Sequence, residues 1–352
     1  MTIILVAFVA AALLTGLARH YLLRRKILDI PNERSSHSVP TPLGGGMAIV
    51  VVFLLTVLWL MQRGAISSNL TWALVGGGLT IAAAGILGDF FRVSASLRLL
   101  IHFLAAGWAL WRLDGMGPLH LGRVVWDWGW VGHIVGLVGL VWMVTLYNYM
   151  DGINGLAGIE AVFVGGFGGL FLAASGMAGL SQVALALAGA SAGLLVWNFP
   201  IARVFMGDVG SGFLGFAFGI LAISSGKERP GLLWCWLILL SVFVADATLT
   251  LIRRLASGSR WSEPHRTSGY QHAARRWGHS KVTLTIAAVN IAWLLPLAWA
   301  ARIRPAVAPL LAAVALTPLV YMAFRHGAGR EYSFQNLRAP EREDRVTADS
   351  QT

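Results

Sequence analysis

Long apolar runs constrain the fold of this chain more than any other feature. A helix needs about 20 mostly apolar residues to cross the roughly 30 Å hydrocarbon core of a bilayer. Backbone polar groups inside hydrocarbon must be satisfied within the segment, so such runs fold as helices. We find about eleven of them in the 352 residues: 2–18, 44–61, 70–87, 97–111, 131–146, 156–175, 181–199, 209–225, 231–252, 282–301 and 306–324. The sequence therefore predicts an all-α, polytopic integral membrane helix bundle with ten to eleven transmembrane helices.

Composition excludes several other classes of protein. Only 12% of the residues are charged and 57% are apolar, whereas soluble proteins carry about 25% charged residues. The single cysteine, Cys235, rules out an intrachain disulfide. The net charge of +11 is not gathered on a basic face with interleaved aromatic residues. We therefore relate it to membrane topology and anionic substrates, and expect no nucleic-acid partner.

The distribution of basic residues predicts how the chain is oriented in the membrane. No charged side chain precedes the first run, whereas Arg19, Arg24, Arg25 and Lys26 follow it. With the N-terminus outside, 20 of the 27 Lys and Arg residues fall on the inner side and 7 on the outer side, in accord with the positive-inside rule. Residues 1–324 then form the transmembrane domain, and residues 325–352 form a polar cytoplasmic tail that we expect to be disordered.

Polar residues with strong chemical character lie at the ends of the runs, on the predicted cytoplasmic side. Ionisable groups at membrane depth are candidates for function, although each one alone could simply cap a helix. They come from five loops, which favours a single interfacial site. The set is Asp29, Arg34, His37, Asp89, Asn148, Asp151, Asn154, Asp208, His265 and Arg266.

Two of these loops contain motifs that suit phosphate chemistry. Residues 148–155, NYMDGING, hold two amides and a carboxylate at a spacing of three, and residues 205–212, FMGDVGSG, place Asp208 at a glycine-rich helix start. Backbone N–H groups at a helix start favour phosphate, and a carboxylate suits Mg²⁺ that bridges phosphate oxygens. The chain contains neither a Walker A loop nor a His/Cys zinc pattern.

Taken in order, these residues resemble the polyprenyl-phosphate N-acetylhexosamine-1-phosphate transferase family (glycosyltransferase family 4), in particular its members that initiate O-antigen or capsule synthesis. The resemblance runs from Asp29 to Lys281. It is carried by Asp29, Pro31, Asn32, Arg34, His37, Pro42, Gly45, Gly46, 85–89 (GILGD), 148–155, Asn198, Pro200, Phe205, Gly207, Asp208, Gly210, Ser211, Asp246, Arg253, Arg254, His265, Arg266, Tyr270 and Gln271.

The resemblance implies transfer of N-acetylhexosamine 1-phosphate from a UDP-sugar to undecaprenyl phosphate, with release of UMP. It further implies a multi-pass enzyme in the bacterial inner membrane, with Mg²⁺ (or Mn²⁺) as cofactor and membrane lipid around it; a homodimer stays open. The implied catalytic residues are Asp89, Asp151, Asp208, His265 and Arg266, with Asp208 and Asp89 on the metal. The implied substrate-binding residues are Arg34, His37, Gly45, Gly46, Asn148, Asn154, Asn198, Gly207, Tyr270 and Gln271.

Two positions depart from the family pattern. Gly88 stands where the family usually has the first acid of an Asp-Asp pair, and the family often has another histidine near Ser268. An inactive homologue that acts as a membrane scaffold is therefore one alternative. A transporter or flippase is another, and it predicts ionisable groups at the bilayer midplane, where Asp246 is the good example. His102, expected to lie away from the site, receives no role.

Overall fold

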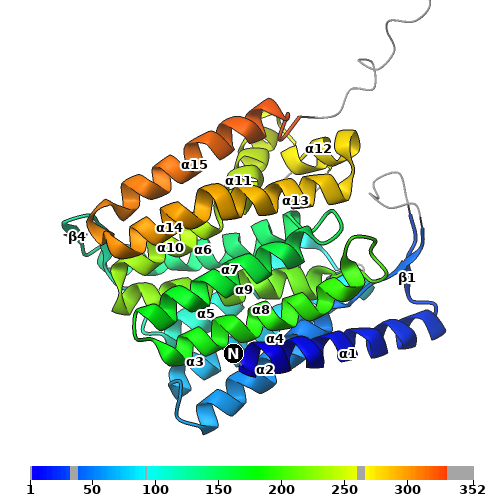
Figure 1. The fold of residues 1–352 in the computed structure, drawn as a ribbon, viewed down its shortest axis with the longest axis horizontal. Helices are drawn as coiled ribbons and strands as arrows, with labels where there is room; N and C mark the ends of the chain where they lie inside the picture. Colours follow the sequence, from blue (N-terminus) through cyan, green and yellow to red (C-terminus); the bar gives the residue numbers. More distant parts are fainter. Residues whose placement is uncertain (1, 32–38, 92, 260–265, 331–352) are drawn as a thin grey trace, which may run out of the picture.

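The computed structural model describes residues 2–31, 39–91, 93–259 and 266–330, and within them the chain is a bundle of long helices (Figure 1). The predicted all-α membrane bundle is confirmed. The helices are α1 (Thr2–Arg24), α2 (Gly46–Gln62), α3 (Ser68–Trp72), η1 (Ala73–Gly77), α4 (Gly78–Phe90), α5 (Ala95–Arg112), α6 (Gly129–Tyr149), α7 (Leu156–Ala174), α8 (Ala178–Asn198), α9 (Asp208–Glu228), α10 (Pro230–Leu239), α11 (Ser241–Ala256), α12 (Gly269–Trp277), α13 (His279–Val289), η2 (Asn290–Leu294), α14 (Leu295–Ile303), η3 (Pro305–Val307) and α15 (Ala308–Arg325).

Each of the eleven apolar runs coincides with helical structure, but not every one forms a simple span. Among the described residues, eight helices are long and apolar enough to cross a membrane. The pair α10 and α11 makes a ninth if it counts as one broken span, since it bends by 69°. Helix α2 is shorter, and α5, which carries Arg98, His102 and Arg112, falls outside this set. The expected ten to eleven crossings therefore include two helices that do not meet the criterion.

Helix α9 is the centre of the bundle, since 83% of its most apolar 18-residue window is buried inside the protein, against 17% for the peripheral α1. Glycines let its neighbours approach its first turn. A Cβ on Gly46 of α2 would lie 2.4 Å from the Cα of Gly210, and one on Gly85 of α4 would lie 2.4 Å from the Cα of Val209. Only hydrogen fits there, so α2 and α4 meet the start of α9 backbone to backbone.

Short strands mark the two ends of the bundle. The hairpin of β3 (Leu119–Leu121) and β4 (Val124–Trp126) lies at one end, and β1 (Leu28–Asp29) with β2 (Thr41–Pro42) lies at the other, near α12 (Figure 1). After β2, the chain runs beside the segment that precedes α9. Gly45 N donates to Phe205 O at 2.8 Å, and Gly46 N donates to Met206 O at 2.9 Å. The loops of the predicted site gather at this second end.

Candidate active site

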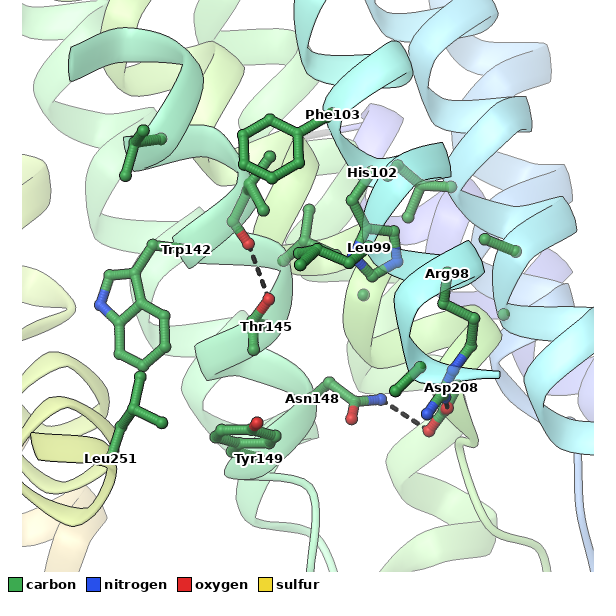
Figure 2. Close-up of a pocket in the computed structure, with 18 of the residues that line it drawn as sticks. Arg98, Leu99, His102, Phe103, Trp142, Thr145, Asn148, Tyr149, Asp208 and Leu251 are labelled. Carbon is green, nitrogen blue, oxygen red and sulfur yellow. Dashed lines mark hydrogen bonds and ion pairs between the residues drawn. The ribbon is translucent and has the colours of Figure 1, made fainter. Parts of the chain in front are cut away.

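The first turn of α9 brings together residues from four helices. Asp208 accepts a hydrogen bond from Asn148 Nδ2 of α6 at 2.6 Å and forms an ion pair with Arg98 Nη1 of α5 at 2.5 Å (Figure 2). Asn148 Nδ2 also donates a hydrogen bond to Ser211 Oγ at 3.1 Å. The Arg98 and Asp208 side chains remain about one-third exposed, at 33% and 32%. Asp208 is thus held in place while still open to a ligand.

Asp89, at the end of α4, contacts the backbone of the same turn. Its two carboxylate oxygens accept from Asp208 N at 2.9 Å and from Val209 N at 3.3 Å. Gly207 precedes them with φ +78°, and a Cβ there would lie 2.5 Å from Asp89 Oδ2. Asp89 therefore caps α9. The expectation that the start of α9 offers free N–H groups to phosphate is wrong, because Asp89 takes the first two and Gly207 O accepts from Gly210 N and Ser211 N.

The loop between α6 and α7 lies beside this turn. Asp151 in that loop is half-buried, and desolvation, followed by the negative charges of Asp208 and Asp89, raises its pKa well above the usual value. The three carboxylates thus lie close enough to repel one another. Among the described residues, no group of three or more His, Cys, Asp and Glu residues forms a ready metal site.

The donor set nevertheless fits a hard cation. Carboxylates and amide oxygens are the ligands that Mg²⁺ takes from proteins, which commonly supply only one or two carboxylates while substrate phosphates complete the shell. Asp208 is partly exposed and its neighbour Asn148 has an amide oxygen. Asp208 is the better candidate for holding the ion, since about a third of its side chain is exposed, whereas the two oxygens of Asp89 fix the backbone of the turn.

A cavity of about 610 Å³ opens from this polar cluster into the membrane part of the bundle. Figure 2 shows Arg98, Asn148 and Asp208 close together, with Leu99 and Phe103 above them in the view and Trp142 and Leu251 on the opposite side. The wall comes from α4, α5, α6, α9 and α11, with Tyr270 and Gln271 of α12 at the polar end. A cavity with this polarity suits an amphipathic ligand that has an anionic head.

A second carboxylate cap holds α12 against the site. Asp246 of α11, which is buried, accepts from Gly269 N at 2.8 Å and Tyr270 N at 2.7 Å. The hydroxyl of Tyr270 donates to Tyr149 O at 2.8 Å, beside the Asp151 loop. Asp246 therefore fixes the start of α12, as Asp89 fixes the start of α9.

Ser268, near which the family often has another histidine, has a structural role at the start of α12. Ser268 and Gln271 form a capping box at the start of α12, in which Ser268 N donates to Gln271 Oε1 at 3.3 Å. Gln271 and Tyr270 both line the cavity. Arg266 lies just before α12 and is partly exposed, but it does not line the cavity.

Several predicted binding residues shape the loops and lie outside the cavity wall. Asn198 is buried, accepts from Gly155 N at 2.8 Å and donates to Val204 O at 2.9 Å, so it joins the two site loops. Asn154 donates to Pro200 O at 3.2 Å. Gly45, Gly46 and Gly207 permit close backbone packing. Three expected residues, Arg34, His37 and His265, lie outside the described residues.

Two residues of the cavity were missed from the sequence. Arg98 was counted only as a basic residue of the inner side, and His102 was expected to lie away from the site, whereas both line the cavity one helical turn apart. The available signal was their position, since a cation and a polar ring four residues apart face the same side of an otherwise apolar helix.

Comparison with known proteins agrees with this geometry. The sequence model of glycosyl transferase family 4 matches residues 71–226, which run from α3 through α9 and contain Asp89, Asn148 and Asp208. This match covers less than half of the chain, and it includes the helices that meet at the site. The resemblance to polyprenyl-phosphate N-acetylhexosamine-1-phosphate transferases is thereby confirmed.

Members of the family with curated names align over most of the chain. A probable undecaprenyl-phosphate N-acetylglucosaminyl 1-phosphate transferase of Bacillus subtilis is 27% identical over 279 residues, 75% of either chain. A phospho-N-acetylmuramoyl-pentapeptide-transferase of Moorella thermoacetica is 32% identical over 53% of this chain and 62% of its own length. A putative glycosyltransferase of Streptomyces coelicolor is 29% identical over 77% of this chain and 61% of its own. Gly85 of α4, Asn148 of α6 and Asp208 of α9, which carry the resemblance in sequence, all line the cavity.

Proposed function

We propose that the chain transfers N-acetylhexosamine 1-phosphate from a UDP-sugar to undecaprenyl phosphate and initiates O-antigen or another surface polysaccharide. The single observation that carries this proposal is the cavity, in which Arg98, Asn148 and Asp208 lie at the end of an apolar channel between membrane helices. A polyprenyl chain suits the apolar wall, and its phosphate suits the polar end. The names of the Bacillus and Moorella relatives support the class of reaction.

The reaction needs a nucleophile, a leaving group and neutralised charge. An oxygen of the lipid phosphate attacks the sugar-linked phosphorus of the UDP-sugar, the bond to the bridging oxygen breaks, and UMP leaves with that oxygen. Phosphoryl transfer depends mainly on positioning and on stabilising charge over the phosphate oxygens. Arg98 can bind phosphate oxygens with two N–H groups, a geometry that lysine lacks.

The other side chains orient the reactants. Asn148 holds Asp208, and Asp89 fixes the turn that carries it. Mg²⁺ bound by Asp208 would supply positive charge to the phosphate oxygens as negative charge moves to the leaving group. Tyr270, Gln271 and Gly152 line the cavity, and we assign them to the nucleotide sugar. The oxygen-only donor set also accepts Mn²⁺.

The test is UMP release by the purified protein with undecaprenyl phosphate, Mg²⁺ and a panel of UDP-N-acetylhexosamines. Release should require lipid and metal and should fall at least 100-fold in Asp208→Asn. The matched control is Asp114→Asn at the other end of the bundle, where φ is +54° and asparagine is tolerated. No release from any donor by folded, lipid-binding protein would favour the inactive homologue.

Location in the bacterial inner membrane, with this site on the cytoplasmic face, is part of the proposal. Ser257 at the end of α11 and Ser68 at the start of α3 are both exposed. In intact cells, an impermeant thiol reagent should label Ser68→Cys and spare Ser257→Cys until the membrane is permeabilised. The native Cys235 is buried and should not interfere. Labelling of Ser257→Cys from outside would contradict the orientation.

A further inference from the structure

His102 lies in the cavity with an unsatisfied nitrogen. Its Nδ1 is fully buried and has no hydrogen-bond partner among the described residues, yet the ring lines the same cavity as Arg98 and Asp208 (Figure 2). A buried polar group without a partner destabilises the fold. Because protein atoms cover Nδ1, a ligand in the cavity meets the Nε2 side of the ring, which donates a hydrogen bond in the neutral Nε2–H tautomer.

The position of His102 along the cavity identifies which part of a ligand it meets. It follows Arg98 by four residues in α5, so both side chains face the same side of the helix. Arg98 is at the polar end, bound to Asp208, Phe103 lies beyond His102, and Trp142 lies on the opposite side of the cavity (Figure 2). His102 therefore sits where a phosphorylated lipid changes from head to hydrocarbon.

We infer that His102 is an acceptor-binding residue that hydrogen-bonds the phosphate of the polyprenyl phosphate from the membrane side, while Arg98 binds it from the other. This inference rests on the proposed function and deepens it. A neutral imidazole suits this depth, because it offers an N–H to phosphate without bringing a second permanent charge into the apolar wall. The donor nucleotide, which enters from water at the other side of Asp208, would not reach it.

The test separates acceptor from donor. His102→Leu removes the hydrogen bond and His102→Gln keeps a donor of similar reach, while Leu104→Ala alters an exposed position of the same helix as a control. We expect His102→Leu to raise KM for undecaprenyl phosphate by about 10- to 100-fold, as for loss of a hydrogen bond to a charged group. KM for the UDP-sugar should stay within twofold, His102→Gln should recover most of the loss, and Leu104→Ala should behave as wild type.

Binding without donor keeps this inference distinct from the proposed reaction. Undecaprenyl phosphate is titrated onto each variant in detergent, and its Kd is compared with that for undecaprenol, which lacks the phosphate. A His102→Leu defect for the phosphate form alone supports the inference even if no UDP-sugar is turned over. Equal Kd values for wild type and His102→Leu, or a rise in donor KM in place of acceptor KM, would overturn it.

Discussion

The carboxylate of Asp89 accepts the backbone N–H of Asp208 at 2.9 Å, so one acid of the site sets the position of the other. This contact lets α4 determine where α9 begins. Asp89 thus has a capping role that another good cap residue could fill, whereas the side chain of Asp208 is partly exposed and can meet a ligand.

Asp89→Asn should keep the fold and much of the activity, because its one amide oxygen can still accept from Asp208 N and only the longer bond from Val209 N is lost. We expect less than a tenfold loss of kcat and a small change in Tm. Asp89→Ala should lower stability by about 1–2 kcal/mol and reduce kcat further. The measurements are thermal unfolding and UMP release. Were Asp89 an essential metal ligand or proton acceptor, Asn and Ala would be equally inactive.

Gly88→Ala should reduce activity more than stability. A Cβ at Gly88 would lie 2.9 Å from Arg98 Nη1 and 3.0 Å from Asp208 Oδ2, so the ion pair must shift. We expect kcat to fall by about tenfold, as for misplacement of a positioned group, with Tm within a few degrees of wild type. Gly88→Asp, which restores the family acid, should compete with Asp208 for Arg98. An increase in UMP release in Gly88→Asp would contradict this reading and favour a degenerate site in the natural chain.

Metal-free protein should lose stability as the pH rises. Burial and two neighbouring carboxylates raise the pKa of Asp151, so the folded state holds this proton more tightly than the unfolded state. Ionising Asp151 above its unfolded pKa of about 3.9 therefore costs folding free energy, and stability falls with increasing pH. In EDTA, Tm should decrease between pH 5 and 8 for wild type but less for Asp151→Asn. Added Mg²⁺ should raise Tm at pH 8 more in wild type than in Asp208→Asn.

Glu160→Gln should leave the bundle intact or stabilise it. Asn290 Nδ2 donates to Glu160 Oε2 at 2.5 Å inside the bundle, while Glu160 Oε1 and Asn290 Oδ1 are buried with no partner among the described residues. A glutamine amide can donate to Asn290 Oδ1 and still accept from Nδ2, whereas alanine leaves Asn290 unpaired. We expect Glu160→Ala to cost about 1–3 kcal/mol, measured by thermal unfolding. Equal losses in both variants would argue against the reciprocal pair.

The helices and the grouping of the site loops could be predicted from sequence, since both follow from apolar length and from which ends share a membrane face. The contacts could not. Nothing in the spacing of Asp89 and Asp246 distinguishes a ligand from a cap, because that depends on which helix start each carboxylate meets. From the sequence, His102 was expected to lie away from the site because it falls within an apolar run. Its place on the cavity wall depends on how α5 packs against α6.

The 69° break between α10 and α11 has a kinetic consequence. Beyond the break, Leu251 and Leu255 of α11 form part of the cavity wall, and Leu255 is 50% exposed, so this wall reaches the outer surface of the bundle. On the proposed function, the acceptor diffuses in two dimensions and enters sideways, while the donor arrives from solution. The turnover rate should then follow the mole fraction of polyprenyl phosphate in the lipid or detergent phase: diluting that phase with inert lipid should slow the reaction even when the bulk concentration of acceptor is unchanged.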